Sequence, residues 1–310
     1  MSTHVIIGAG PVAHATATEL LAKGFTVRSV TRSGSGEMPA GVERKRADAS
    51  NESALLQATR NAAAIYNFAN PPYAKWVTEW PPIATALLAA AEKHGAVLVT
   101  MSNLYGYGPS TRPFKETDAL ASSGAKGKVR AAMWKQAIDA HQAGRVRVTE
   151  ARASDFIGPR VVDANMGDRV VDNVLTGRAV GLMGKLDVPH AITAMGDVGV
   201  AMAVLGTDER ALGRAWHVPT ATAQNQREIV AGLCRAAGVP MVKARAIPSI
   251  ALTIGGLFVP MLRELREVEY QFAAPFDLDS SDFTQTFGIS ATPLEQTYVD
   301  TVAWFRGRQK

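Results

Sequence analysis

A short apolar run, Val5-Ile6-Ile7, leads directly into a glycine-rich turn near the start of the chain. The turn, Gly8-Ala9-Gly10-Pro11-Val12-Ala13, has the spacing G-x-G-x-x-A. Residues 12–21 then have the composition of a helix, and Lys23-Gly24 provides its C-terminal stop. Strand, glycine turn and helix in this order form the fingerprint of a dinucleotide-binding βαβ unit. The start of the chain therefore predicts an α/β fold built on a parallel sheet.

Each residue of the turn has a physical role in binding a pyrophosphate. Gly8 permits the tight turn, Gly10 lets the backbone approach the ligand, and the small Ala13 lets the helix pack close to the strand. Pro11 and Val12 begin the helix, whose first N–H groups and positive dipole face the phosphates. We expect all five residues to contact the cofactor. A glycine turn without a ligand is the less favoured alternative.

The end of the second strand bears on which dinucleotide is bound. NAD-binding proteins place Asp or Glu about 20 residues after the glycines, where the carboxylate accepts from the ribose 2′-hydroxyl. Here Thr31-Arg32-Ser33 stands at that point without a carboxylate. Arg32 can bind a 2′-phosphate through two nitrogens, and Ser33 can donate to it. We predict NADP(H) as the cofactor, with NAD(H) less favoured; a solvated Arg32 without this role is the alternative.

Two later loops are expected to complete the cofactor site. Asp48 can accept from the adenine amino group, or it can cap the helix that follows. The loop Ala69-Asn70-Pro71-Pro72 follows the next strand and passes the ribose where the strand order reverses. The double proline stiffens this loop. We therefore expect Ala69 and Asn70 to contact the cofactor.

Strands alternate with helices through the first half of the chain. We expect strands near residues 5–7, 25–30, 64–68, 97–100 and 146–149, and helices near 12–21, 53–60, 83–94 and 129–143. This alternation predicts a doubly wound parallel sheet, a Rossmann fold. After Pro159 the segments become irregular. We predict a dinucleotide-binding domain over 1–160 and a smaller mixed α/β substrate lobe over 161–310, with some of its segments returning to the first domain.

Composition argues against several other classes of protein. The net charge is +5, but the basic residues are scattered, so no nucleic-acid surface is expected. The single cysteine, Cys234, excludes a disulfide framework, and the six dispersed histidines show no metal-binding spacing. No targeting signal is recognised at Met1-Ser2-Thr3-His4, and the apolar stretch Ile247–Leu262 is interrupted by proline and glycine. We expect a cytoplasmic protein without a metal site or a membrane span.

Three blocks of sequence resemble the extended short-chain dehydrogenase/reductase family, the NAD-dependent epimerase/dehydratase group. Ser102–Gly106 is similar to its S-x-x-V-Y-G block, Arg152–Pro159 to its R-x-x-x-x-Y-G-P block, and Met195–Ala201 to its V-x-D-V-A segment. The resemblance implies the Rossmann fold, a small-molecule substrate and a possible homodimer. It also implies that Met101 and Phe156 lie beside the nicotinamide.

The chain departs from this family at the residues that carry the chemistry. Lys126 and Arg130 form K-x-x-x-R where the family has Y-x-x-x-K. In the family, the tyrosine moves a proton and the lysine holds the nicotinamide ribose. The resemblance therefore implies that Arg130 holds the ribose, and that Lys126 or Tyr105 handles the proton beside Ser102. For Tyr105, as for Tyr107, packing within the loop is the alternative.

Two functions follow from these residues. The first is an NADP(H)-dependent oxidoreductase, or an enzyme like the epimerases and dehydratases, acting on a carbonyl or hydroxyl of a small organic or sugar-type substrate. The second is a catalytically impaired NADP(H)-binding redox sensor or regulatory protein. The intact Arg152–Pro159 block favours the first, and the missing Tyr-Lys pair favours the second.

Overall fold

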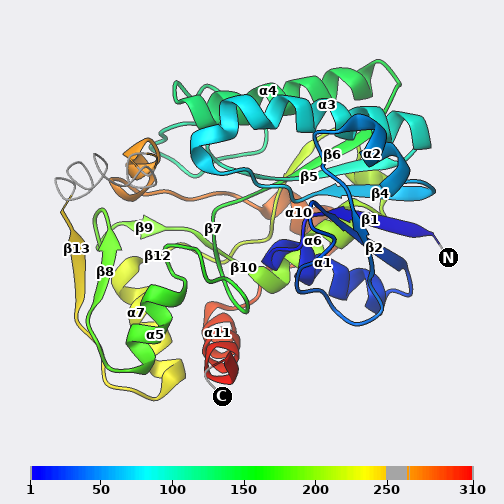
Figure 1. Cartoon of the computed structure of the whole chain (residues 1–310). Coiled ribbons are helices and arrows are strands. Elements are labelled where there is room, and N and C mark those ends of the chain that lie inside the picture. Colours follow the sequence, from blue (N-terminus) through cyan, green and yellow to red (C-terminus); the bar gives the residue numbers. More distant parts are fainter. Residues whose placement is uncertain (1, 249–263, 265, 309–310) are drawn as a thin grey trace. The chain divides into compact units, whose positions relative to one another are not determined.

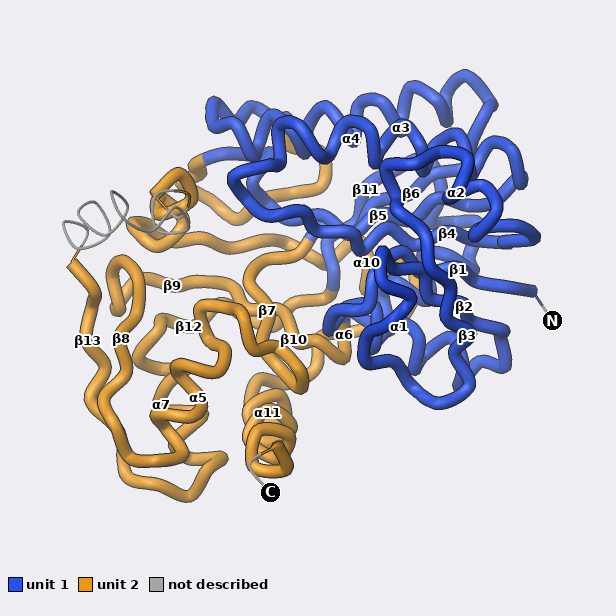
Figure 2. The backbone as a smooth tube through the Cα atoms, in the orientation of Figure 1, with its two compact units in different colours: residues 1–108, 119–152, 198–218 blue, residues 109–118, 153–197, 219–310 orange. Residues whose placement is uncertain are grey.

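The structure is a computed structural model that describes residues 2–248, 264 and 266–308 (Figure 1). The chain forms two compact units, distinguished by colour in Figure 2. Unit 1 comprises residues 1–108, 119–152 and 198–218, and unit 2 comprises 109–118, 153–197 and 219–310. The apolar stretch Ile247–Leu262 lies outside the described residues from position 249 onward. Among the helices that are described, none is long and apolar enough to cross a membrane.

Unit 1 is built on a seven-stranded sheet with the strand order β11-β6-β5-β4-β1-β2-β3. The strands are β1 (Thr3–Ile7), β2 (Thr26–Thr31), β3 (Glu43–Arg46), β4 (Ala62–Asn67), β5 (Val97–Asn103), β6 (Arg147–Ala153) and β11 (Ala215–His217). The pairs β1–β2, β1–β4, β2–β3, β4–β5 and β6–β11 are parallel. The strand order reverses between β1 and β4, which is the position where α/β sheets of this kind bind ligands.

Helices cover both faces of this sheet (Figure 1). The helices of unit 1 are α1 (Pro11–Ala22), α2 (Glu52–Ala58), α3 (Trp76–His94), α4 (Ala125–Gln142) and α6 (Met195–Leu205), with short 3-10 turns η1 (Tyr73–Lys75) and η2 (Glu209–Ala211). Helices α2, α3 and α4 lie on one face and α1 and α6 on the other. Gly199 of α6 packs against the backbone of Ala15, where a Cβ would lie 2.9 Å from the carbonyl oxygen. The predicted doubly wound parallel sheet is confirmed.

The central strands are apolar because both of their faces are covered. Val5, Ile6 and Ile65 have no exposed surface, as expected for a parallel sheet between two helical layers. By contrast, β3 at the sheet edge is Glu43-Arg44-Lys45-Arg46, and its side chains are largely exposed. An edge strand of charged residues carries no apolar period, so its bounds could not be read from the sequence.

Helix α3 begins seven residues before the predicted start at Ile83 and continues through Pro81 and Pro82. Prolines usually end a helix because they lack an N–H group and clash with the preceding turn. Here the burial of Trp76 and Trp80, each at most 1% exposed, holds the first two turns against the core. The predicted start at Ile83 was wrong because the packing of Trp76 and Trp80 extends the helix back through the prolines.

Unit 2 consists of short strands and helices around its own core. Its strands form three pairs: β7 (Asp155–Ile157) with β10 (Ile192–Ala194), β8 (Val180–Met183) with β13 (Ala244–Ile247), and β9 (Pro189–His190) with β12 (Gln224–Asn225). Its helices are α5 (Asp168–Leu175), α7 (Gln226–Ala237), α10 (Ser281–Phe287) and α11 (Leu294–Arg308), with the 3-10 turn η3 (Glu269–Phe272). Helix α7 begins with a capping box in which Asn225 and Glu228 each bond the other's backbone. Its buried face packs against Tyr298 and Phe305 of α11.

Candidate functional site

The glycine turn lies at the carboxyl end of β1, where the chain enters α1. Gly8 has a φ of +127°, and a Cβ there would lie 2.9 Å from the carbonyl oxygen of Phe68, so only glycine fits. Gly10 is the N-cap of α1, and no side chain among the described residues caps the helix. A Cβ at Gly10 would meet nothing within 4 Å. The first amides of an α-helix have no acceptor within the helix, and the exposed Gly10 before α1 leaves room for a pyrophosphate.

The loop after β2 folds back onto this turn. Thr31 Oγ1 donates to the carbonyl oxygen of Ser35 at 2.9 Å, which closes the loop on itself. A Cβ at Gly36 would overlap the Cβ of Ala9, so the loop lies directly against the glycine turn. The loop exposes Arg32 and Ser33. The two segments predicted to bind the pyrophosphate and the 2′-phosphate are therefore adjacent.

A second arginine, Arg46, lies beside this loop and was missed as a cofactor-binding candidate. The register of β2 and β3 pairs Thr31 with Arg46, and the Arg46 Nε donates to the carbonyl oxygen of Arg32 at 3.1 Å. Arg46 is exposed. The basic run 44–46 was visible in the sequence, but only the pairing of the third strand with the second brings it to the Arg32 loop.

Asp48 follows β3 and forms a local turn. Its carboxylate accepts from the Ser50 amide at 2.9 Å and from the Ser50 hydroxyl at 2.7 Å. These two hydrogen bonds, followed by the charge of Arg32, lower the pKa of Asp48. The helix cap of α2 is Asn51, which accepts from the amide of Ala54. The alternative of Asp48 as a helix cap was therefore wrong, and its contact with adenine stays a prediction.

The loop after β4 is held at both ends. Near its start, Asn67 Oδ1 accepts from the amide of Ala69 at 3.2 Å. Near its end, Trp76 Nε1 donates to the carbonyl oxygen of Pro71 at 2.9 Å. Asn70 is exposed between these anchors. The loop therefore presents Ala69 and Asn70 at the carboxyl end of β4, next to β1, in a fixed conformation.

Two tyrosines meet at the carboxyl ends of β4 and β5. Tyr73 belongs to η1, and Tyr105 comes two residues after the end of β5. Their phenol oxygens are hydrogen-bonded at 2.9 Å. The Lys126 ammonium lies 5.4 Å from the centroid of the Tyr73 ring, and Lys126 is only 2% exposed. Both phenol side chains are half-buried, so they are more accessible than the lysine.

Arg130, one turn along α4 from Lys126, is enclosed by two indole rings. The centre of its guanidinium lies 4.6 Å from the Trp76 ring centroid and 4.5 Å from that of Trp80. Burial lowers the pKa of Arg130 to about 10, and the charge of Glu150 opposes this change. The Arg130 Nε and Nη1 are buried without a hydrogen-bond partner among the described residues. Arg130 therefore acts on this region mainly through its charge.

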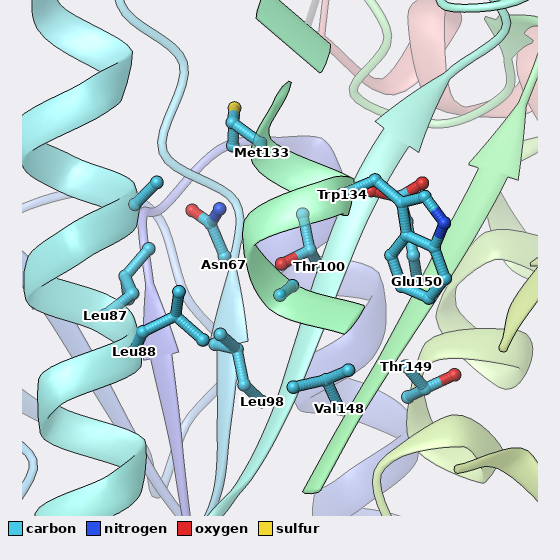
Figure 3. Close-up of a pocket in the computed structure, with 12 residues that line it drawn as sticks. Asn67, Leu87, Leu88, Leu98, Thr100, Met133, Trp134, Val148, Thr149 and Glu150 are labelled. Carbon is cyan, nitrogen blue, oxygen red and sulfur yellow. The ribbon is translucent and has the colours of Figure 1, made fainter. Parts of the chain in front are cut away.

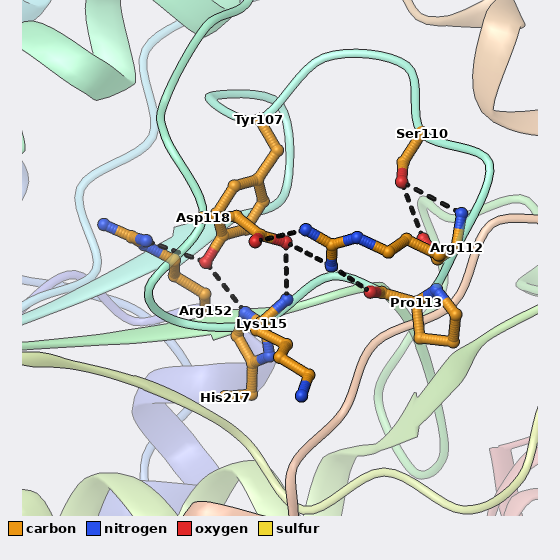
Figure 4. A network of polar contacts seen from close by, with 8 residues as sticks. All are labelled: Tyr107, Ser110, Arg112, Pro113, Lys115, Asp118, Arg152 and His217. Carbon is orange, nitrogen blue, oxygen red and sulfur yellow. Dashed lines mark hydrogen bonds and ion pairs between the residues drawn. The ribbon is translucent and has the colours of Figure 1, made fainter.

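Tyr107 belongs to a separate buried network in unit 1 (Figure 4). Its hydroxyl accepts from Arg152 Nη1 at 2.8 Å and is hydrogen-bonded to His217 Nε2 at 2.8 Å. Arg152 Nε also donates to Glu150 at 2.7 Å. Each of these four residues is at most 5% exposed. This network ties the ends of β6 and β11 to the loop after β5, so Tyr107 has a packing role.

Figure 4 also draws a polar network within unit 2. Arg112 and Asp118 form an ion pair at 2.6 Å, and the Lys115 amide donates to the same carboxylate at 2.8 Å. Arg112 is well exposed in this pair, so it contributes little to stability. These bonds fix the conformation of the segment between residues 110 and 118.

A cavity of about 20 Å³ lies between the sheet and helices α3 and α4 (Figure 3). Its polar lining comes from Asn67, Thr100, Thr149 and Glu150, and Trp134 is among its other lining residues. A volume of this size holds about one water molecule. The cavity is therefore too small for a substrate and lies in the interior of unit 1.

The remaining predicted site residues belong to several elements. Met101 and Ser102 are consecutive residues of β5, so their side chains point to opposite faces of the sheet; both are buried. Phe156 lies in β7 of unit 2. No group of three His, Cys, Asp or Glu side chains within the described residues could hold a metal ion.

Comparison with known proteins identifies the family and the fold of this chain. A family model described as the NAD dependent epimerase/dehydratase family matches residues 5–218. Among solved structures, a UDP-glucose 4-epimerase from Bifidobacterium longum in complex with NAD+ and UDP has a TM-score of 0.80 at 18% identity, with 99% of each chain covered. A dTDP-glucose 4,6-dehydratase from Bacillus anthracis in complex with NAD has a TM-score of 0.79 at 16% identity, covering 100% of this chain and 98% of that one. At these identities the likeness shows the fold. No curated protein sequence is significantly similar to this chain.

Proposed function

This chain belongs to the NAD dependent epimerase/dehydratase family, and on this basis we propose that it is an NADP(H)-dependent enzyme acting on a carbinol or carbonyl carbon of a nucleotide sugar. The resemblance found in the sequence blocks is thereby confirmed. The substrate class is supported by the solved structures of similar fold, which include enzymes named for UDP-glucose and dTDP-glucose. When bound, NADP(H) gives or takes a hydride at C4 of its nicotinamide.

The observation that carries this proposal is the uncapped start of α1 behind Gly8 and Gly10. Gly8 cannot carry a side chain, whereas the space in front of Gly10 is open. Backbone amides at a helix N-terminus bind a pyrophosphate without further charged residues. Pro11, Val12 and Ala13 continue this surface into the helix. The donor set present in the chain therefore fits a dinucleotide.

The preference for NADP(H) is supported by the charge beside the second strand. Arg32 and Ser33 are exposed on the loop that packs against the glycine turn, and Arg46 flanks its backbone. Two guanidinium groups and the Ser33 hydroxyl bind a 2′-phosphate better than they bind an unphosphorylated ribose 2′-hydroxyl. Asp48 stays ionised near Arg32, so this carboxylate competes with the phosphate for one of the two arginines.

A turnover assay tests this function. The purified chain is incubated with NADP+ and a panel of nucleotide sugars that includes UDP-glucose and dTDP-glucose. The absorbance of NADPH follows oxidation of the sugar. Epimerisation regenerates the cofactor and leaves this absorbance unchanged, so proton NMR of the sugar follows it instead. Gly10→Ala, purified in the same way, is the control for contaminating activity. At a limiting concentration of NADP+, we expect turnover by the natural chain and at least tenfold lower turnover by the variant. Equal activity of both proteins would contradict the proposal.

One observation favours a second function. The position at which the family has its tyrosine holds Lys126, which is buried and cannot act as a phenol. A chain that binds NADPH tightly but turns over no member of a broad panel of sugars, aldehydes and ketones is a redox sensor or regulatory protein. The same assay therefore separates the two functions.

A further inference from the structure

We propose that Tyr105 moves the proton in the reaction, that the hydrogen-bonded phenol of Tyr73 positions it, and that the charges of the buried Lys126 and Arg130 favour the ionised form of this pair. This inference rests on the proposed function and adds to it a residue, Tyr73, that neither the glycine turn nor the family blocks point to. The tyrosines of the proton step then lie in the segments that follow β4 and β5. The family instead has its tyrosine in the first turn of the helix that corresponds to α4.

The position of the pair fits this role. Tyr73 follows β4 and Tyr105 follows β5, and both strands lie on the opposite side of β1 from the Arg32 loop. In a doubly wound sheet, a dinucleotide lies across the carboxyl ends of the strands at the switch point. With its 2′-phosphate end at β2 and its pyrophosphate at β1, the other end of the dinucleotide extends toward β4 and β5.

The two hydroxyls are arranged for proton transfer. Their oxygens lie 2.9 Å apart, within the range of O–H···O hydrogen bonds. The Tyr73 and Trp76 rings also pack perpendicular to each other, at a centroid distance of 5.0 Å and an interplanar angle of 90°. Trp76 is anchored by its own bond to Pro71. The orientation of the Tyr73 phenol is therefore fixed by its neighbours.

Lys126 is unsuited to act directly. It is 2% exposed, and the helix turn that carries it is pressed against the Tyr105 loop. A Cβ at Gly127 would overlap the Ser122 side chain and the carbonyl oxygen of Tyr105, so the absence of a side chain at Gly127 permits this contact. The ammonium is thereby held near the Tyr73 ring, where its positive charge favours one negative charge on the hydrogen-bonded Tyr73–Tyr105 pair.

Arg130 supplies the second fixed charge. Its guanidinium is held between Trp76 and Trp80, and it attracts the negative charge of Tyr73 and Tyr105 when either is ionised. An arginine keeps its charge in such a buried site more readily than a lysine would, because its intrinsic pKa is higher. Two cations on α4 thus stand beside the phenols of two neighbouring loops.

The proton step balances as follows in the direction of oxidation. The substrate O–H bond breaks, and its proton forms a new O–H bond at the Tyr105 phenolate oxygen. The electron pair left on the substrate oxygen forms the carbonyl, as the carbon loses a hydride to the oxidised dinucleotide. Tyr73 keeps its hydroxyl hydrogen and donates a hydrogen bond to the Tyr105 phenolate oxygen, which stabilises the phenolate. Tyr105 is therefore the catalytic residue and Tyr73 the positioning residue.

Titration of the phenols by ultraviolet difference absorbance tests the charge arrangement without cofactor or substrate. We expect the phenolate signal that appears at the lowest pH to be lost in Tyr105→Phe. We expect it to move to higher pH in Arg130→Met and to be partly restored in Arg130→Lys. Tyr66→Phe is the matched control, because the Tyr66 phenol bonds His4 instead of facing a cation. If the phenolate signal that appears at the lowest pH is unchanged in Tyr105→Phe, the inference is overturned.

Kinetics then test the role in the reaction. In a chain that turns over, Tyr105→Phe should lower kcat by about 100-fold or more, whereas KM and NADPH affinity stay within about twofold. Tyr73→Phe should lower kcat less and move the pH–rate profile to higher pH. Full activity of Tyr105→Phe would overturn the inference while leaving the proposed function intact. Absence of turnover by the natural chain, in contrast, is failure of the proposed function itself.

Discussion

The Nε–H of Arg46 donates to the carbonyl oxygen of Arg32 at 3.1 Å, which joins the ends of two parallel strands. The bond uses the backbone of Arg32, so it leaves the Arg32 side chain exposed beside Ser33. It also places a second guanidinium at the loop that packs on the glycine turn. The proposed preference for NADP(H) therefore rests on a tertiary arrangement of two arginines, of which the sequence indicated one.

Removing either arginine should affect NADPH far more than NADH. We expect Arg32→Ala to weaken NADPH binding at least tenfold, about 1.4 kcal/mol, because a bidentate contact with the 2′-phosphate is lost. Arg46→Ala should weaken it by a smaller factor. NADH affinity should change less than twofold in both variants. Fluorescence titration measures all of these, with Arg44→Ala as the control that removes the same charge from the same strand. Equal losses for NADPH and NADH would refute the assignment.

Substitution of the two turn glycines should have different consequences. Gly8→Ala places a Cβ 2.9 Å from the carbonyl oxygen of Phe68 at a φ of +127°, so it should destabilise the fold by about 1–3 kcal/mol. Gly10→Ala adds its methyl group to open space, so stability should change by less than about 1 kcal/mol. Urea unfolding measures both changes.

The two glycine variants also separate an effect on folding from an effect on cofactor binding. The Gly10 methyl group would occupy the space predicted for the pyrophosphate, so Gly10→Ala should lose at least tenfold in NADPH affinity while remaining folded. A folded Gly10→Ala variant that binds NADPH normally would show that the dinucleotide does not approach this turn.

His4 should make stability depend on pH. Burial lowers the pKa of His4 to about 4 from its usual 6.5, and its Nδ1 is hydrogen-bonded to the Tyr66 hydroxyl at 2.9 Å. The unfolded chain therefore binds a proton more readily than the folded chain between pH 6.5 and 4. Stability should be full above pH 6.5 and should fall by on the order of 2 kcal/mol as pH drops to 4, after allowance for solvent screening.

Urea unfolding at pH 7.5 and pH 4.5 measures this loss. His4→Gln has no titrating group at this position. Between pH 7.5 and pH 4.5 this variant should therefore lose less stability than the natural chain, and the difference should equal the contribution of His4. An identical pH dependence in the natural chain and in His4→Gln would mean that other groups cause the change.

The capping box of α7 should contribute measurably to unit 2. Asn225 accepts from the amide of Glu228 at 3.0 Å, and Glu228 accepts from the amide of Asn225 at 2.8 Å. Asn225→Ala removes the first of these bonds and should cost about 1 kcal/mol of unfolding free energy. Asn225→Ser, which can still cap the helix, should recover most of it. Thermal unfolding of the three proteins would show this order, and equal melting temperatures would contradict it.

The sequence predicted the fold class and most elements of unit 1 because buried parallel strands and the helices that cover them have clear hydrophobic patterns. The run Val5-Ile6-Ile7 and its glycine turn are local signals, and both are found where they were expected. The pairs of strands in unit 2 were missed because two to four residues, such as Gln224–Asn225, carry no period. Local sequence also could not show that the packing of Trp76 and Trp80 overrides Pro81 and Pro82.

The candidate site was predictable only in part, for a related reason. The glycine turn and Arg32 belong to one βαβ unit, so their proximity follows from its connectivity. Tyr73, Tyr105 and Arg130 come from three segments and meet only when β4, β5 and α4 are packed. The sequence marked Tyr105 and Arg130 through a resemblance to family blocks, whereas no pattern marked Tyr73.

The most direct test of the account is the affinity of the purified chain for the two reduced dinucleotides. Fluorescence titration with NADPH and with NADH, under the same salt and pH, measures both dissociation constants. We predict that both bind through the glycine turn and that NADPH binds at least tenfold more tightly. Absence of binding to either dinucleotide, or tighter binding of NADH, would contradict it.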